Sequence, residues 1–139
     1  MIIVDTNVLS ELMRPSPSST VIAWVGAQTS DELYATSITL AEIHYGIQRL
    51  PNGRRKDLLN STASEVFNAF TERILPFDAA AAIHYATIVN DRDQAGLPID
   101  GFDAQIAAIC RAHEATLATR NVKDFTQTGI NIIDPWQQS

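Results

Sequence analysis

The chain has 139 residues, 45% of them hydrophobic and 19% charged, and this composition is typical of a globular protein and excludes a disordered one. Its 16 acidic and 10 basic residues give a net charge of −6, which argues against nonspecific nucleic-acid binding by the surface as a whole. The single cysteine, Cys110, excludes an internal disulfide and fits a reducing compartment.

The length predicts one domain spanning residues 1–139. The sequence shows no charged-then-apolar leader and no long apolar run, so we expect neither a signal peptide nor a membrane span. We therefore expect a cytoplasmic protein.

The chain opens on an apolar, β-branched run, residues 2–4, which predicts a strand buried on both faces. This run stops at a carboxylate, Asp5, and residues 6–12 continue with helical spacing. A second helix is predicted over residues 21–27, with Ser18 or Ser19 as its N-cap. Asp5 thus stands where a buried strand passes into a helix.

Residues 33–36 predict a second, shorter strand. Thr39 and Glu42 have the spacing of a capping box, which predicts a helix from there to about Leu50. After the Pro-Asn-Gly break, residues 54–70 predict an amphipathic helix. Its expected buried residues are Leu58, Leu59, Val66, Phe67 and Phe70.

The second half of the chain continues the alternation of strands and helices. Residues 74–77 predict a strand that Pro76 places at an edge or an end of a sheet, and Asp78 caps the helix that follows. A further helix begins near Asp103, and strands are predicted at 116–119 and 130–133. This alternation predicts an α/β fold with a mainly parallel sheet.

Three carboxylates and one amide follow the predicted strands at equivalent places. Asp5 follows the first strand, Glu42 lies in the first turn of the helix after the second strand, and Asp103 opens the helix before the next-to-last strand. Asn121 follows that next-to-last strand. Right-handed crossovers bring such junctions to one edge of a parallel sheet, so we expect these side chains to converge.

Converging carboxylates repel one another, and a hard divalent cation relieves that repulsion. Magnesium takes one or two carboxylates, keeps several waters and accepts phosphate oxygens as its other ligands. The chemistry that fits this arrangement is metal-assisted hydrolysis of a phosphodiester.

Each residue also has a structural interpretation. Glu42 can serve only as the capping-box partner of Thr39, and Asp103 only as an N-cap. Asp100 and Asp124 are expected to be solvated loop or cap residues. Asp5 is the hardest to explain structurally, because the strand before it is so apolar.

Four blocks of the sequence carry a resemblance to a known family: Ile3–Leu12 (IVDTNVLSEL), Ser37–Gly46 (SITLAEIHYG), Phe102–Ala108 (FDAQIAA) and Leu117–Phe125 (LATRNVKDF). The closing Ile133–Trp136 (IDPW) fits as well. These blocks resemble PIN-domain proteins, in particular VapC-type toxins of the FitB-like and StbB-like branch. The resemblance covers essentially the whole chain and implies a three-layer α/β/α sandwich with a mainly parallel central sheet.

The resemblance also implies an activity: a Mg²⁺- or Mn²⁺-dependent ribonuclease, the toxin of a type II toxin–antitoxin pair. The metal-binding acids of the family fall on Asp5, Glu42 and Asp103. The fourth family position, often Asp, is Asn121 in this chain. Thr6 is expected near the site.

The family also implies partners: a VapB-type antitoxin that covers the active groove, operator DNA reached only through that antitoxin, and a homodimer or a dimer of toxin–antitoxin heterodimers. RNA is the expected substrate. Arg120 and Lys123 flank Asn121 and are therefore placed to meet a phosphate backbone.

Two other functions remain open from the sequence. A haloacid-dehalogenase-like phosphohydrolase also has an aspartate after an apolar first strand, but it needs a second acid two residues on, where this chain has Asn7. A catalytically silent PIN-like subunit that binds an antitoxin and modulates its operator binding is the other alternative. The retained acids Asp5, Glu42 and Asp103 argue against it, but Asn121 in place of an acid keeps it open.

Overall fold

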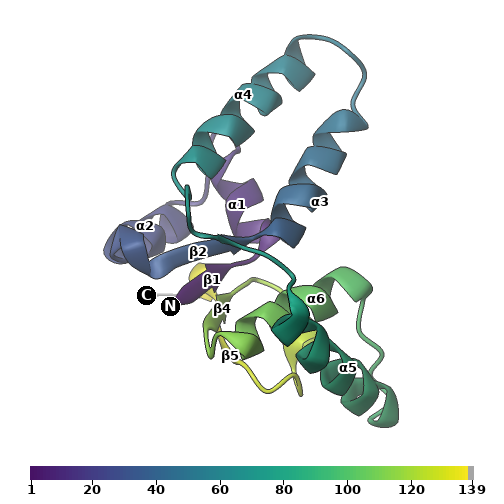
Figure 1. The fold of residues 1–139 in the computed structure, drawn as a ribbon. Helices are drawn as coiled ribbons and strands as arrows, with labels where there is room; N and C mark the ends of the chain where they lie inside the picture. The colour runs from purple at the N-terminus through teal and green to yellow at the C-terminus, as the bar shows by residue number, and fades with distance from the viewer. Residues whose placement is uncertain (138–139) are drawn as a thin grey trace.

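The computed structural model describes residues 1–137, which form a five-stranded parallel sheet with helices on both faces (Figure 1). The strand order is β3-β2-β1-β4-β5, and every neighbouring pair is parallel. The strands are β1 (Ile2–Val4), β2 (Leu33–Thr36), β3 (Ile74–Leu75), β4 (Thr116–Ala118) and β5 (Asn131–Ile133). The parallel sheet and the edge position of the proline-flanked strand were both predicted from the sequence.

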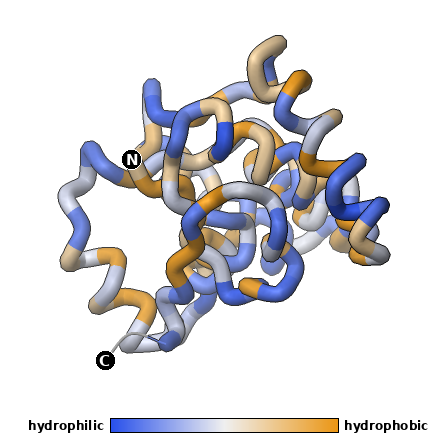
Figure 2. The backbone as a smooth tube through the Cα atoms, turned by 90° about the horizontal axis from the view of Figure 1, so that it is seen from below, coloured by the Kyte–Doolittle hydropathy of each residue, from blue (hydrophilic) through white to orange (hydrophobic). Residues whose placement is uncertain are grey.

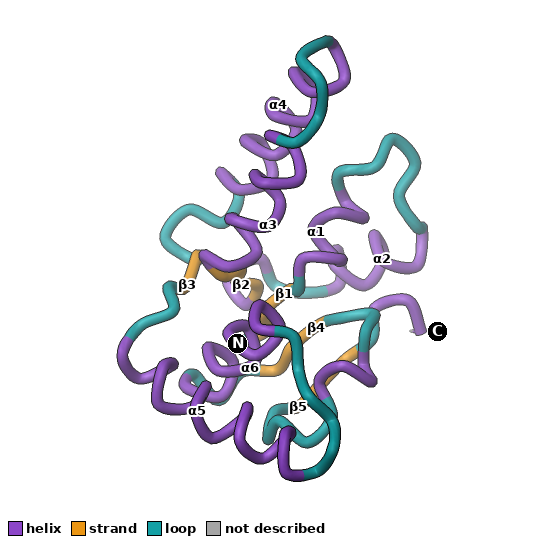
Figure 3. The backbone as a smooth tube through the Cα atoms, turned by 90° about the vertical axis from the view of Figure 1, so that its right-hand side faces the viewer, coloured by secondary structure: helices purple, strands orange, loops and turns teal. Residues whose placement is uncertain are grey.

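Within residues 1–137, six α-helices and three short 3₁₀ helices lie between and after the strands. They are α1 (Thr6–Leu12), α2 (Ser19–Ala27), α3 (Ser37–Gln48), α4 (Arg54–Asn68), α5 (Ala79–Gln94) and α6 (Gly101–Ala112), with η1 (Ser30–Glu32), η2 (Val122–Phe125) and η3 (Pro135–Gln137). Figure 3 shows α1 to α4 on one side of the strands and α5 with α6 on the other. The fold is therefore the α/β/α sandwich that the sequence predicted.

Two apolar cores lie on the two faces of the sheet, and β1 supplies both. Val4 packs with Val8 and Trp24 in the core under α1 to α4, whereas Ile3 packs with Ile106 in the core under α5 and α6. Successive side chains of a strand point to opposite faces, so an uninterrupted apolar run is what a central strand requires. Figure 2 shows this run as a hydrophobic segment entering the molecule from the N-terminus.

The strand order places β1 at the switch point of the sheet. From β1 the chain passes to β2 and β3 on one side, and then returns to β4 and β5 on the other. In open α/β sheets, ligands bind outside the carboxyl ends of the strands at such a point. The residue at that place is Asp5, which caps α1.

A buried arginine joins the two loops that flank this edge. Arg92, near the end of α5, donates from Nε to the Leu97 carbonyl oxygen (2.7 Å) and from Nη1 to the Thr126 carbonyl oxygen (2.5 Å). Leu97 lies in the connection to α6, and Thr126 follows η2. Arg92 therefore fixes the segments that carry Asp103 and Asn121 relative to each other.

Two details of the sequence interpretation were wrong. The N-cap of α3 is Thr36, whose Oγ1 accepts from the Thr39 backbone N–H, so Thr39 and Glu42 do not form a capping box and Glu42 lies in the second turn. Leu58 is 63% exposed although periodicity placed it among the buried residues of α4. Its helix extends beyond the body of the molecule beside α3, where little covers that face (Figure 1).

None of the helices in residues 1–137 combines the length and the apolar character that crossing a bilayer demands.

Helix α5 offers a matched pair of isoleucines for testing the core. Ile88 is fully buried against the sheet, whereas Ile83 on the same helix is 72% exposed. We expect Ile88→Ala to lower the free energy of unfolding by about 2–5 kcal/mol because it leaves a cavity. Ile83→Ala should change it by less than about 0.5 kcal/mol in urea denaturation. Equal losses in the two variants would contradict this assignment of the core.

Candidate active site

A pocket of about 490 Å³ opens at the carboxyl edge of the sheet, and the predicted site residues line it. Asp5 follows β1, Glu42 comes from α3, Asp103 from the first turn of α6, and Asn121 is the N-cap of η2. The structure thus brings together four side chains that are far apart in the sequence. Thr6 lines the same pocket.

Asp5 is buried and held on both of its oxygens. Its Oδ1 accepts the Thr6 backbone N–H (2.8 Å), and its Oδ2 accepts the Thr119 hydroxyl (2.7 Å) and, more weakly, the Asn7 amide (3.4 Å). Burial raises the pKa of Asp5, and the charge of Asp124 raises it further, although the hydrogen bonds from Thr119 and Thr6 oppose these effects. The carboxylate is therefore fixed in orientation but costly to keep charged without a cation.

Three hydroxyl groups form a chain that ends on Glu42. Thr6 Oγ1 donates to Glu42 Oε1 (2.9 Å), so its single proton is used, and the 3.0 Å contact between Thr6 Oγ1 and Thr39 Oγ1 must have Thr39 as the donor. Thr36 Oγ1 then donates to Thr39 Oγ1 (3.4 Å). Thr36 and Thr39 are fully buried, so this chain connects Glu42 to the interior and fixes its position.

Asp103 feels the repulsion of the other acids most strongly. Partial burial and the charges of Asp5, Asp100, Asp124 and Glu42 raise its pKa to about 7. Burial and the charges of Asp5 and Asp100 also raise the pKa of Glu42, against the hydrogen bond from Thr6. The expected electrostatic conflict between converging acids is present in the structure.

Two acids that the sequence interpretation set aside take part in this field. Asp100 is the N-cap of α6, so Asp103 is not the cap, and the Asp100 charge acts on Glu42 and Asp103. Asp124, in η2, acts on Asp5 and Asp103. Asp124 lies three residues after Asn121 and adds negative charge near that residue, where the resemblance leads us to expect an acid.

Asn7 and Thr119 were also missed as members of the site. Asn7 Nδ2 donates to Thr119 Oγ1 (3.1 Å), and Asn7 Oδ1 accepts the Arg120 backbone N–H (3.3 Å). Thr119 Oγ1 also accepts the Asn121 backbone N–H (3.1 Å). Their positions next to the strand ends were the only signal in the sequence, and that signal does not say which way a side chain points.

Basic and aromatic residues also line the pocket. Arg14, Arg120 and Trp136 line it together with Glu11. Lys123, the other expected phosphate contact, lies in η2 and is not among the residues that line the pocket. Its expected contact with RNA stays a prediction.

The donor set fits a hard divalent cation. All the acidic ligand candidates offer oxygen, and their mutual repulsion is the conflict that such a cation removes. Across residues 1–137, no three acidic, histidine or cysteine side chains stand close enough to ligate one ion together. A divalent ion in the pocket would therefore have fewer than three of these side chains as ligands, and Mg²⁺ accepts this because it fills its other positions with water.

The raised pKa of Asp103 makes the stability of the metal-free protein depend on pH. Between pH 3.8 and about 7 the folded state binds more protons at Asp103 than the unfolded state does, so stability falls as pH rises through this window. We expect Asp103→Asn to flatten this dependence in thermal melts recorded with a chelator. Asp57→Asn, on exposed α4, is the control and should keep the wild-type slope. An unchanged slope in Asp103→Asn would contradict the electrostatic interpretation.

The hydroxyl chain predicts a specific stability loss. Thr39→Val keeps the shape of the side chain but removes the donor to Thr6 and leaves the buried Thr36 hydroxyl without its acceptor. We expect a loss of about 1–3 kcal/mol in urea denaturation. Thr39→Ser should recover most of it, because the hydroxyl returns. Equal losses in Thr39→Val and Thr39→Ser would mean that packing, not hydrogen bonding, is what Thr39 supplies.

Comparison with known proteins finds relatives along nearly the whole chain. Three relatives match nearly the full length of both chains: VapC ribonuclease Y4jK of Sinorhizobium fredii (39% identical, 99% of each chain), plasmid stability protein StbB of Pseudomonas syringae pv. tomato (39%, 99% of each) and toxin FitB of Neisseria gonorrhoeae (36%, 98% of this chain and 99% of FitB).

A solved structure of FitAB bound to an IR36 DNA fragment contains a chain that superposes with a TM-score of 0.93 at 36% identity, covering 100% of this chain and 98% of that one. The family model described as the PIN domain matches residues 2–131, a span that contains Asp5, Glu42, Asp103 and Asn121. From this match and these relatives, the chain belongs to the PIN domain family.

Proposed function

We propose that this protein is a metal-dependent endoribonuclease and the toxin of a type II toxin–antitoxin pair. The observation that supports this most directly is the pocket itself: carboxylates from three separate segments line one cavity at the switch point of a parallel sheet. A purely structural role does not require buried or half-buried acids to gather at one place, since such gathering costs stability.

The relatives support the same activity. Two of the proteins that match nearly the whole chain are named as a VapC ribonuclease and as a toxin. The dehalogenase-like alternative has no such support, and Asn7 is occupied in the structure by hydrogen bonds to Thr119 and Arg120.

Mg²⁺, or Mn²⁺, is the cofactor that we propose for this pocket, with Asp5 and Asp103 as the best candidates to hold it and Glu42 beside them. When bound, such an ion lowers the pKa of a water ligand and neutralises charge on the phosphate. Asp5 is oriented for this purpose by Thr6 and Thr119, which leave lone pairs of its oxygens free to face the pocket. Asn121 adds a neutral amide that can orient a water or a phosphate oxygen.

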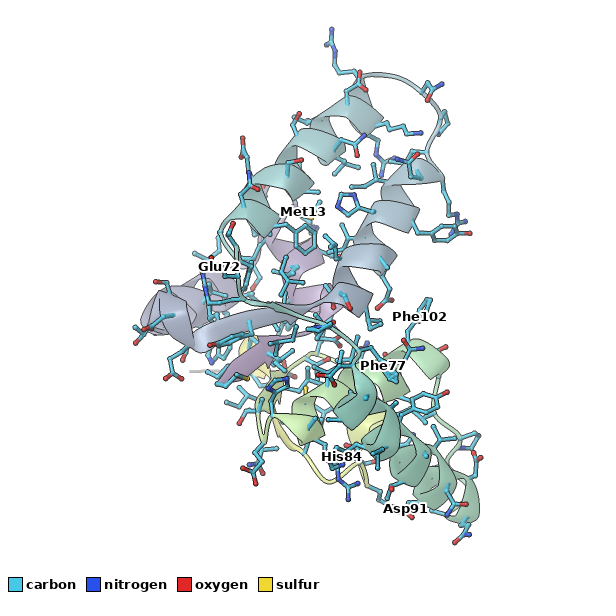
Figure 4. All side chains as sticks on the ribbon, viewed as in Figure 1. Met13, Glu72, Phe77, His84, Asp91 and Phe102 are labelled. Atoms are coloured by element: carbon cyan, nitrogen blue, oxygen red, sulfur yellow. The ribbon has the colours of Figure 1, made fainter. Side chains whose placement is uncertain are left out.

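A groove next to the pocket is the proposed binding site of the antitoxin. It has a volume of about 920 Å³, lies between α1, α3 and α4, and shares Thr6, Arg14 and Glu42 with the pocket. Its walls are largely apolar: Leu12, Met13, Ile43, Ile47, Leu50, Leu58 and Leu59. In Figure 4, Met13 lies among the side chains between α4 and α1. An apolar peptide segment followed by an arginine fits this groove and the carboxylates of the adjoining pocket.

Operator DNA is proposed to meet the assembly through the antitoxin. The solved FitAB complex is bound to DNA. The present chain has a net charge of −6, which disfavours direct contact between its surface and duplex DNA.

Cleavage of a structured RNA tests the proposal. Purified protein should cut it with Mg²⁺ and not with a chelator, and Asp5→Asn or Asp103→Asn should lower the rate by at least ~10²-fold because metal capture fails. Asp57→Asn is the matched control and should keep the rate. Melts without metal should show both active-site variants as stable as wild type, or slightly more so, because repulsion is relieved.

Two outcomes would contradict it. Collapse of Asp5→Asn and Asp103→Asn in the melts would mean that the folded state needs these two carboxylates for its stability. If every RNA tested stays intact with Mg²⁺ while the antitoxin still binds, the protein is the catalytically silent subunit.

A further inference from the structure

Two arginines line the same pocket as the acids, and neither is used in the chemistry proposed above. Arg14 follows α1, and Arg120 follows β4. They come from the two segments that also supply Asp5 and Asn121. The pocket therefore offers positive charge as well as carboxylates.

A buried carboxylate anchors Arg14. Glu11 has a side chain that is only 7% exposed, and its Oε1 lies 3.2 Å from Arg14 Nη1, whereas the Arg14 side chain is 65% exposed. Glu11 Oε2 also accepts the Ser18 backbone N–H (2.8 Å). The Ser18 hydrogen bond, followed by Arg14 and Arg120, lowers the pKa of Glu11, so the anchor stays charged. Only Nη1 of Arg14 is engaged with Glu11, and the rest of the guanidinium is open to an anion.

An aromatic ring anchors Arg120. The guanidinium carbon of Arg120 lies 5.1 Å from the centre of the Trp136 ring, in a cation–π contact. Trp136 is itself partly buried against the core under α1 to α4. Within residues 1–137, Arg120 makes no salt bridge with a carboxylate. Its charge is thus held in place without a direct ion pair, although Glu11 is close enough for the two charges to interact.

We propose that Arg14 and Arg120 form a subsite for a backbone phosphate of the RNA next to the one that is cut. The proposal rests on the ribonuclease function above and adds the position of the bound strand. A strand whose scissile phosphate lies at the acids must place its neighbouring phosphate elsewhere in the same pocket. Arginine presents paired donors that match phosphate oxygens, and both arginines are held by anchors that leave such donors free.

These two arginines suit RNA better than the antitoxin, although Arg14 also lines the groove proposed for the antitoxin. A peptide that neutralises the acids must be cationic there, and two arginines in the same pocket repel more of the same charge. A polyanion has the opposite pattern: it needs the cation at the acids and positive side chains beside them. Arg14 and Arg120 therefore complete the pocket for a nucleic-acid strand.

Salt dependence of binding tests the subsite without relying on catalysis. A short single-stranded RNA of mixed sequence, labelled with a fluorophore, is titrated with the full chain in a chelator, and binding is followed by anisotropy at several salt concentrations. Removing one phosphate contact should reduce the slope of log K against log[salt] by about 0.7. We expect that loss from Arg14→Gln and again from Arg120→Gln. Arg54→Gln, on exposed α4 and outside the pocket, is the control and should keep the wild-type slope.

Cleavage kinetics with Mg²⁺ give a second measurement. Either variant should raise KM and leave kcat within about twofold of wild type, since the contact is made in the ground state and the transition state alike. Trp136→Leu should resemble Arg120→Gln, because it removes the ring that holds Arg120, and Trp136→Phe should restore most of the slope.

Three results would overturn the subsite. If the slopes of Arg14→Gln and Arg120→Gln equal that of Arg54→Gln, the two arginines do not contact a phosphate. Cleavage by the wild type would still support the nuclease function in that case. If the two variants bind the antitoxin more weakly but keep the salt-dependence slope of RNA binding, Arg14 and Arg120 contact the antitoxin and not the RNA. If wild type neither binds nor cuts RNA, the function itself fails, and the subsite fails with it.

Discussion

Repulsion between carboxylates at the edge of the sheet is the constraint on which the arrangement of the other site residues depends. Burial and the charges of four other acids raise the pKa of Asp103 to about 7, and burial raises that of Asp5. Such an arrangement lowers stability unless a cation joins it. The hydroxyls of Thr6 and Thr119 stabilise the charged carboxylates by donating to them, so the site keeps its shape while its charge stays unbalanced.

The topology of the sheet explains why these acids meet. All strands are parallel, so their carboxyl ends lie at one edge, and β1 stands where the chain order reverses. Asp5 is therefore central, and the segments after β2 and β4 flank it. Arg92 links the connection before α6 to the loop after η2, and so holds two more of the contributing segments in register.

The pocket and the groove are adjoining sites that two competing molecules, an RNA strand and an antitoxin peptide, can occupy. The groove between α1, α3 and α4 is largely apolar and reaches the acids through Thr6 and Glu42. The pocket also contains Arg14 and Arg120, of which Arg14 lines the groove as well. A peptide in the groove and an RNA strand in the pocket would thus meet at Glu42 and Arg14, which is a physical basis for inhibition by a partner.

The sequence alone determined the elements and the fold class, because apolar spacing and capping residues are local signals. It correctly gave β1, the start of α5 at Asp78, the edge strand and the parallel sheet, and its motifs indicated the PIN family and its candidate acids.

Only the tertiary structure decided which side chains interact. Thr6 and Glu42 are 36 positions apart and Thr119 and Asp5 are 114 apart, so no local pattern could pair them. For the same reason the sequence interpretation took Asp100 and Asp124 for ordinary loop or cap acids. The cap of α3 is different, because it is a local contact between Thr36 and Thr39, and the sequence interpretation placed it three residues too late. A side chain's partners depend on where distant segments lie, and that is settled only when the sheet and its helices pack.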